Sequence, residues 1–158
     1  MNILEIKNFS KTYKGNKKAV DNLCITVEAG DIYGFIGHNG AGKSTTIKSV
    51  VGVLEFTEGE IYIDGKQVNN IPASKREIGF VFQSYNLVPV LNVYENIILP
   101  TELDGGKVNK AFVQQIVQTL GLSDRLDALP NQLSGGQQQR VAIARALAAA
   151  PAIILADE

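Results

Sequence analysis

The sequence predicts an α/β domain built around a phosphate-binding glycine loop. Short apolar runs of strand length alternate with longer stretches of helical periodicity, which is typical of α/β domains. In addition, the apolar run 31–36 leads through a glycine loop, residues 37–44, into a stretch with helical character. A strand, a glycine loop and a helix in this order form the local context that a phosphate loop needs.

The glycine loop has the pattern Gly-x-x-x-x-Gly-Lys-Ser. Its glycines let the backbone wrap closely around a phosphate, and N–H groups at a helix start attract anions. We expect Lys43 to reach the β- and γ-phosphates of a nucleotide and the Ser44 hydroxyl to bind Mg²⁺. The alternative is an ordinary glycine-rich turn before a helix. The loop residues expected to contact the nucleotide are Gly37, Asn39, Gly40, Ala41, Gly42, Lys43, Ser44 and Thr45.

Composition indicates one ordinary globular domain. The 158 residues are 45% hydrophobic and 20% charged, with a formal net charge of -1 and no basic cluster. Bulk electrostatics therefore gives no reason to expect a nucleic-acid partner. Cys24 is the only cysteine and lies in the apolar stretch 23–27, so we expect a small core side chain in a reducing compartment.

The sequence shows no signal peptide and no apolar run of bilayer length. The longest candidate, residues 141–156, is interrupted by Arg145 and Pro151. We therefore expect any membrane role to depend on a partner.

The first half of the chain predicts mainly strands. Two early strands before the strand of the glycine loop suggest an antiparallel sheet joined to a parallel one. Asp64-Gly65 between apolar alternating runs is typical of a hairpin turn. The expected elements are strands at 3–7, 20–27 and 31–36, a helix at 44–54, hairpin strands at 61–63 and 66–68, and a buried strand at 78–82.

The second half predicts an all-helical insertion followed by a strand. Asn92 is expected to cap a helix at 93–99 that ends at Pro100, and Gly121 to end a helix at 110–120. Ser123 is expected to cap a short helix, and another helix follows Gln137. The apolar strand 153–156 then delivers two carboxylates.

Four motifs, in this order, resemble the nucleotide-binding domain of ATP-binding-cassette (ABC) proteins. Residues 37–44 match the Walker A loop, and Gln83 matches the glutamine of the Q-loop. Residues 133–137, Leu-Ser-Gly-Gly-Gln, match the ABC signature, and residues 153–158 match Walker B with its following acid. The resemblance covers the whole chain, and the signature is the most discriminating motif because other phosphate-loop families lack it.

The resemblance implies a P-loop NTPase fold of the ABC type, with an N-terminal antiparallel β subdomain, a parallel core sheet and an inserted helical subdomain. Residues 1–158 would form part of that domain. Within it, 1–83 would hold the β subdomain and nucleotide-binding core, 84–150 the helical subdomain with the signature, and 151–158 the Walker B strand.

The resemblance also implies ATP and Mg²⁺ as cofactors and assigns roles around them. Asp157 would hold Mg²⁺ through water, and Glu158 would act as the catalytic base. Gln83 would touch Mg²⁺ or the attacking water, and Tyr13 would stack on adenine. From the residues alone, the carboxylates could be solvated surface, Gln83 a polar strand end and Tyr13 a loop residue packed on the sheet.

The signature predicts a second anion-binding helix start, formed by Ser134, Gly135, Gly136 and Gln137. The alternative is a helix cap with a glycine hinge. In the resembled family, two domains pack head to tail, and each ATP lies between Walker A of one and the signature of the other. The implied mechanism is a transporter powered by ATP-driven dimer closure and hydrolysis-driven opening.

Residues 82–89 and 95–100 resemble the group that serves lipoprotein release, macrolide efflux and antimicrobial-peptide resistance. The region from Gln83 to Leu99 would then receive a helix of a separate membrane permease, which places the chain in the cytoplasm at the inner face of the membrane. Two alternatives stay open. One is a soluble ABC protein acting on ribosomes or DNA, which the lack of basic clusters disfavours. The other is a nucleotide-binding module that does not hydrolyse ATP.

The chain departs from the family pattern after Glu158, where family members continue with a switch histidine and a central strand. The only histidine, His38, lies inside the glycine loop. We therefore expect the C-terminal part of the family fold to be absent. Since a missing central strand exposes backbone groups and apolar surface, we expect this chain alone to be a poor ATPase that is marginally stable or associates.

Overall fold

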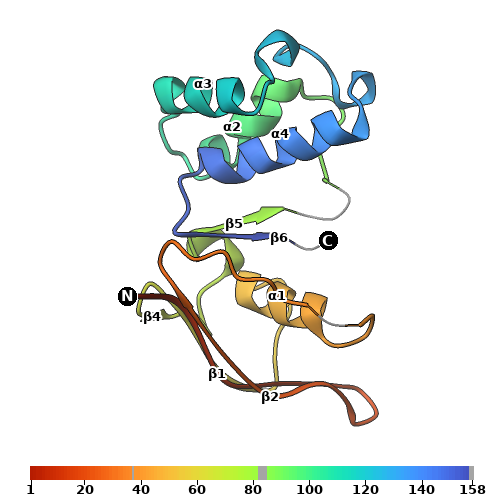
Figure 1. Ribbon diagram of the computed structural model, residues 1–158, viewed down its shortest axis with the longest axis vertical. Coiled ribbons are helices and arrows are strands. Elements are labelled where there is room, and N and C mark those ends of the chain that lie inside the picture. The colour runs from red at the N-terminus through yellow and green to blue at the C-terminus, as the bar shows by residue number, and fades with distance from the viewer. Residues whose placement is uncertain (37, 82–84, 157–158) are drawn as a thin grey trace. The chain divides into compact units, whose positions relative to one another are not determined.

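The structure is a computed structural model that describes residues 1–36, 38–81 and 85–156. The chain divides into two compact units, Met1–Ile78 and Gly79–Glu158, which are described in turn. Figure 1 labels the α-helices and most of the strands of both units. Among the helices of the described ranges, none combines the length and the apolar character needed to cross a bilayer.

The first unit contains a four-stranded antiparallel sheet with the strand order β2-β1-β3-β4. This confirms the predicted antiparallel sheet. Helix α1 contacts β2, and the rings of Phe9 in β1 and Phe56 in the connection before β3 meet at a centroid distance of 5.3 Å. The elements are β1 (Asn2–Tyr13), β2 (Lys17–Glu28), α1 (Lys43–Val51), β3 (Glu58–Ile63), β4 (Lys66–Gln67) and the short 3-10 helix η1 (Ala73–Lys75).

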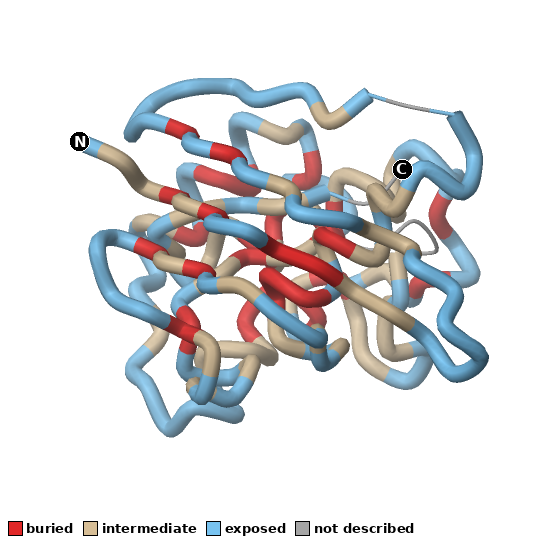
Figure 2. Tube along the Cα trace, turned by 90° about the horizontal axis from the view of Figure 1, so that it is seen from below, coloured by how far each residue is buried: buried red, intermediate tan, exposed pale blue. Residues whose placement is uncertain are grey.

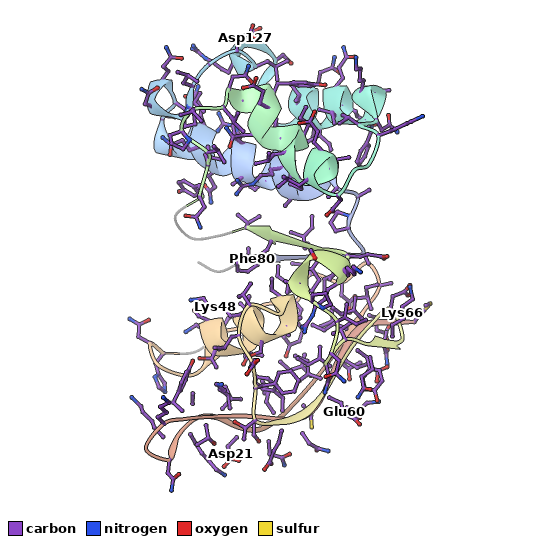
Figure 3. All side chains as sticks on the ribbon, turned by 180° about the vertical axis from the view of Figure 1, so that it is seen from behind. Asp21, Lys48, Glu60, Lys66, Phe80 and Asp127 are labelled. Carbon is purple, nitrogen blue, oxygen red and sulfur yellow. The ribbon has the colours of Figure 1, made fainter. Side chains whose placement is uncertain are left out.

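Buried and exposed residues alternate over the last part of β2, and Figure 2 colours the chain trace by burial. In β2, Ile25 and Val27 are buried, whereas Cys24 and Thr26 are exposed. The prediction that Cys24 is a core side chain is therefore wrong, because the two-residue period of the strand turns it outward. Its sulfur accepts a hydrogen bond from the Asn8 backbone N–H at 3.3 Å. The labelled charged residues Asp21, Glu60 and Lys66 are also exposed (Figure 3).

The predicted hairpin around Asp64 and Gly65 is confirmed. Both residues have left-handed backbones, with φ 47° and φ 72°, and they join β3 to β4. Positive φ at both central residues matches the right-handed twist of the paired strands.

The predicted buried strand at 31–36 is wrong. The structure assigns no strand there, and Ile32 and Ile36 are almost fully exposed, at 102% and 95%. An apolar run becomes a buried strand only when neighbouring strands pair with its backbone. Within the described residues, this segment pairs with no other strand.

The second unit pairs β5 (Ile78–Val81) with β6 (Ile153–Ala156) in a two-stranded sheet. Both arrows point the same way in Figure 1, so the strands are parallel, as expected for strands joined by a long helical crossover. The insertion consists of α2 (Val93–Leu103), α3 (Lys110–Thr119), η2 (Ser123–Arg125), η3 (Pro130–Gln132) and α4 (Gly135–Ala148).

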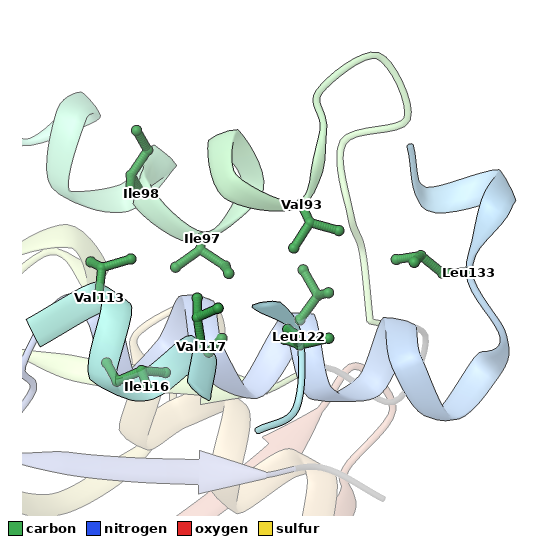
Figure 4. Close-up of a cluster of buried hydrophobic side chains, with 10 residues drawn as sticks. Val93, Ile97, Ile98, Val113, Ile116, Val117, Leu122 and Leu133 are labelled. Carbon is green, nitrogen blue, oxygen red and sulfur yellow. The ribbon is translucent and has the colours of Figure 1, made fainter. Parts of the chain in front are cut away.

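The three α-helices of the insertion enclose an apolar core, shown in Figure 4. Val93 and Ile97 of α2 meet Val113 and Val117 of α3, and Val141 of α4 completes the cluster. These positions recur at helical spacing, which places them on one face of each helix. The predicted helical insertion is confirmed.

Several predicted helix boundaries are wrong. Pro100 lies inside α2, which continues to Leu103; the helical bonds resume after it, where the Asp104 N–H donates to the Pro100 carbonyl oxygen at 3.1 Å. Helix α1 ends at Val51, before a left-handed Gly52. Ser123 is the first residue of η2 and not its cap, and α4 begins at Gly135.

Candidate functional site

The phosphate loop, residues 37–44, runs directly into the first turn of α1. Gly40 and Gly42 have φ 87° and φ 84°, a left-handed backbone that glycine adopts readily. Gly42 occupies the cap position of α1 and has no side chain with which to cap the helix. The Lys43 ammonium folds back over the loop and donates to the carbonyl oxygen of His38 at 3.0 Å. The loop thus holds its cation beside the start of a helix.

Close packing against β2 requires a glycine at position 42. A Cβ atom there would lie 2.5 Å from the carbonyl oxygen of Ala19 and 2.7 Å from Cγ2 of Val20. A Cβ at Gly40 would meet nothing within 4 Å. One glycine therefore serves the packing of the loop on the sheet, while the other leaves the loop open to solvent.

Tyr13 lies near the start of α1. Its hydroxyl is 3.5 Å from Oγ1 of Thr45, and the Lys11 ammonium lies 5.2 Å from the centroid of its ring. The side chain is 42% exposed. The structure thus brings the predicted adenine-stacking residue to the predicted phosphate loop, although the two are about thirty residues apart in sequence.

The opposite end of α1 is held by Arg76, which sequence reasoning missed. The residue is 6% exposed, and its guanidinium donates to the carbonyl oxygens of Ser49 at 2.9 Å, Val50 at 2.7 Å and Ile71 at 2.7 Å. A cation at a helix C-terminus complements the helix dipole. Burial lowers the pKa of Arg76. Arg76 stands in a polar connector with no pattern that could have revealed this role.

The signature loop, residues 133–137, forms the start of α4. The Ser134 hydroxyl accepts from the Gln137 backbone N–H at 3.3 Å, and Oε1 of Gln137 accepts from the Ser134 N–H at 2.8 Å. The neighbouring Gln138 amide donates to the carbonyl oxygens of Pro130 at 2.9 Å and Leu133 at 3.3 Å. These bonds fix the approach of the chain to the helix.

The two glycines of the signature loop are exposed, and the fold does not need them. A Cβ at Gly135 would meet nothing within 4 Å, and one at Gly136 would meet only the end of Arg140 at 3.9 Å. Glycine in a helix is less favourable than alanine by about 1 kcal/mol. The first two residues of α4 therefore carry no side chain, although the packing of the domain would allow one at either position.

The segment between β5 and α2, residues 85–92, is fixed from both sides. Asn96 of α2 is fully buried, and its side chain accepts from the Val88 N–H at 2.8 Å. The same side chain donates to the carbonyl oxygens of Val88, Leu91 and Asn92 at 2.9–3.1 Å. Arg145 of α4 donates to the carbonyl oxygens of Tyr85 and Asn86. Sequence reasoning did not anticipate the role of Asn96 or of Arg145.

Four predicted site residues, Gly37, Gln83, Asp157 and Glu158, lie outside the described residues. The strands that precede three of them are described: β5 ends at Val81 and β6 ends at Ala156. Because parallel strands end at the same edge of a sheet, their carboxyl ends share one edge.

A family model described as ABC transporter matches residues 20–158. A methionine import ATP-binding protein from Clostridium acetobutylicum is 42% identical over 99% of this chain and 51% of its own length. A second such protein, from Shouchella clausii, is 43% identical over 99% of this chain and 48% of its own. The chain belongs to the ABC transporter family.

Solved structures agree with this assignment. A dimeric ATP-binding cassette in a post-hydrolysis state with ADP and phosphate is 39% identical to this ABC chain, with a TM-score of 0.86. The match covers 98% of this chain and 73% of that one. The predicted ABC fold is thereby confirmed.

The curated relatives bear on two further predictions. The chain spans about half the length of the curated relatives it matches. These relatives are methionine import proteins, so the prediction of a subgroup for lipoprotein release, macrolide efflux or peptide resistance is not confirmed.

The tight packing at Gly42 leads to a stability prediction. Gly42→Ala should lower the free energy of unfolding by about 1–2 kcal/mol for the left-handed backbone and by a further ~1–3 kcal/mol for overlap with β2. Gly40→Ala, which has the same backbone conformation in open space, should show the first effect alone. Urea unfolding of both variants measures the difference, and equal losses would contradict the packing account.

Proposed function

We propose that this chain binds Mg-ATP and, in the whole protein, hydrolyses it to drive a membrane transporter. The observation that carries the proposal is the start of α1. The first residues of α2, α3 and α4 are capped by the side chains of Asn92, Asn109 and Ser134, whereas the cap residue of α1 is a glycine, Gly42. No acidic residue lies in its first turn. A helix start of this kind favours a bound phosphate.

Lys43 would exchange its partner when nucleotide binds. Its ammonium now donates to a neutral carbonyl, that of His38, and a charged phosphate oxygen is a stronger acceptor. Because the ammonium already lies over the loop, a small change of its side chain would bring it to the β- and γ-phosphates. Tyr13, beside Thr45, would contact the base.

The residues present suit Mg²⁺. Among residues 1–36, 38–81 and 85–156, no cluster of three His, Cys, Asp or Glu side chains could hold a metal. The proposed ligands are instead the Ser44 hydroxyl, Gln83, Asp157 through water, and phosphate oxygens, all of which are oxygen donors that Mg²⁺ prefers. When bound, Mg²⁺ would neutralise charge on the transferring phosphate.

We further propose Glu158 as the general base that polarises the attacking water, with Gln83 orienting that water. The position of these two residues in the sequence supports both roles. Gln83 follows β5 and Glu158 follows β6, and ligands of open α/β sheets bind at the carboxyl edge of such parallel strands.

The start of α4 would act on ATP held by a second copy of the domain. Gly135 and Gly136 have no side chain, although the fold has room for one at each position. The absence of side chains suits close approach by a phosphate. The Ser134 hydroxyl accepts one bond and keeps its own proton to donate. The solved cassettes that resemble this chain are dimers, which supports a head-to-tail pair.

A permease would dock on the segment after Gln83. Residues 85–92 are held by Asn96 and Arg145, so they present a preformed surface. Val90 is 79% exposed on this segment. The docking would place the chain at the inner face of the membrane, where ATP is available.

The test of ATP binding is Lys43→Ala beside Lys48→Ala, a matched change on the same helix. Lys48 is exposed near the other end of α1 (Figure 3). Lys43→Ala should raise the Kd for Mg-ATP about 10- to 100-fold, because it removes charge-assisted hydrogen bonds. Lys48→Ala should leave the Kd unchanged, as measured by calorimetry.

In the whole protein, Glu158→Gln should retain ATP binding and lose phosphate release. Equal Kd values for Mg-ATP in Lys43→Ala and Lys48→Ala would refute the proposed ATP site at the start of α1. Binding without any phosphate release by the unaltered protein would favour the module that does not hydrolyse ATP.

The test of permease docking compares Val90→Asp with Leu103→Asp. The two side chains are similarly exposed, at 79% and 77%, but Leu103 lies at the far end of α2. Val90→Asp should sharply reduce co-purification of the whole protein with a membrane protein, since it buries a charge in the interface. Leu103→Asp should not. Undiminished co-purification of the Val90 variant would place the docking surface elsewhere.

A further inference from the structure

The chain leaves the Q-loop position through two left-handed residues. Tyr85 and Asn86 have φ 57° and φ 45°, and they follow Gln83 by two and three positions. A bulky side chain such as tyrosine rarely adopts this backbone, and two such residues in succession are rarer still. A conformation of this kind persists only where its surroundings hold it.

The guanidinium of Arg145 holds the left-handed backbone of Tyr85 and Asn86 in place. Nη2 donates to the carbonyl oxygen of Tyr85 at 2.7 Å, and Nη1 donates to that of Asn86 at 2.9 Å. The two donors of one planar fork thus bind two successive carbonyls, a geometry that a lysine cannot reproduce. Within the described part of the chain, no carboxylate pairs with Arg145.

Arg145 belongs to the helix that starts with the signature loop. On the same helix, Ala142 and Ala146 are buried against Val81, the last described residue of β5, and the Tyr85 side chain packs on this cluster. The strand end before Gln83 and the segment after it therefore both rest on α4. The backbone on each side of Gln83 is fixed to the same rigid element.

We propose that Arg145 is a positioning residue for Gln83. By clamping the carbonyls of Tyr85 and Asn86, it ties the segment that follows Gln83 in sequence to the position of α4 and thus of the signature loop. The inference rests on the proposed ATPase function for its catalytic consequence. A shift of the signature helix, as on dimer closure, would then move residues 85 and 86, which follow the glutamine in sequence.

The test uses Arg145→Lys in the whole protein, with Arg125→Lys as the control. Arg125 lies exposed on η2 in the same unit. Arg145→Lys should lower kcat for ATP hydrolysis about 10- to 100-fold, because a small misplacement of a catalytic group has effects of this size. The KM for ATP should stay within about twofold. Arg125→Lys should change neither.

Two further measurements separate a clamp from mere packing. In hydrogen exchange, Arg145→Lys should speed exchange of the amides in 85–88 and leave those in 138–148 protected. Adding Asn86→Gly to Arg145→Lys should restore part of kcat, because glycine adopts the left-handed backbone without support.

The proposal is overturned if Arg145→Lys matches Arg125→Lys in kcat and exchange. It is also overturned if kcat, KM and the protection of α4 deteriorate together, which would make Arg145 a packing residue. If the unaltered protein releases no phosphate, the proposed ATPase function fails instead, and exchange of 85–88 alone decides whether the clamp exists.

Discussion

The backbone N–H groups at the start of a helix must find partners, and this constraint organises the chain. Helices α2, α3 and α4 meet it with their own side chains, through Asn92, Asn109 and Ser134. Helix α1 meets it at a glycine loop that carries Lys43, with Gly42 packed against β2 and Arg76 fixing the far end of the helix. A fixed helix whose cap residue is a glycine suits phosphate binding, because no side chain of its own occupies the cap position.

The second unit gives the signature helix α4 a corresponding role. Its start is capped, yet its first two residues are glycines in open space. Further along the helix, Arg145 and the alanines at 142 and 146 hold the chain on both sides of the Q-loop position. One helix thus joins the proposed contact surface for a second copy of the domain with the segment proposed to receive a permease. This connection gives a physical route by which nucleotide and transporter could influence each other.

Local features were predictable from the sequence, and long-range contacts were not. The glycine loop, the Asp64-Gly65 hairpin and the Asn92 cap depend on neighbouring residues, so their patterns are visible in the chain. Arg76 and Arg145 bind backbone carbonyls about 27 and 60 residues away in sequence. No pattern of residues near either arginine indicates partners at such a separation. The strand expected at 31–36 failed for the same reason, because a strand depends on partners that its own residues do not specify.

The central claim is that ATP is held between the start of α1 in one copy and the start of α4 in another. Its most direct test is sedimentation of the Glu158→Gln protein with and without ATP. ATP should convert monomers to dimers, because each nucleotide would join the α1 start of one copy to the α4 start of the other. Adding Gly136→Glu should abolish the dimer while leaving the Kd for ATP unchanged, since the new carboxylate repels phosphate only across the interface. A dimer that survives Gly136→Glu, or a loss of ATP binding by the monomer, would contradict the account.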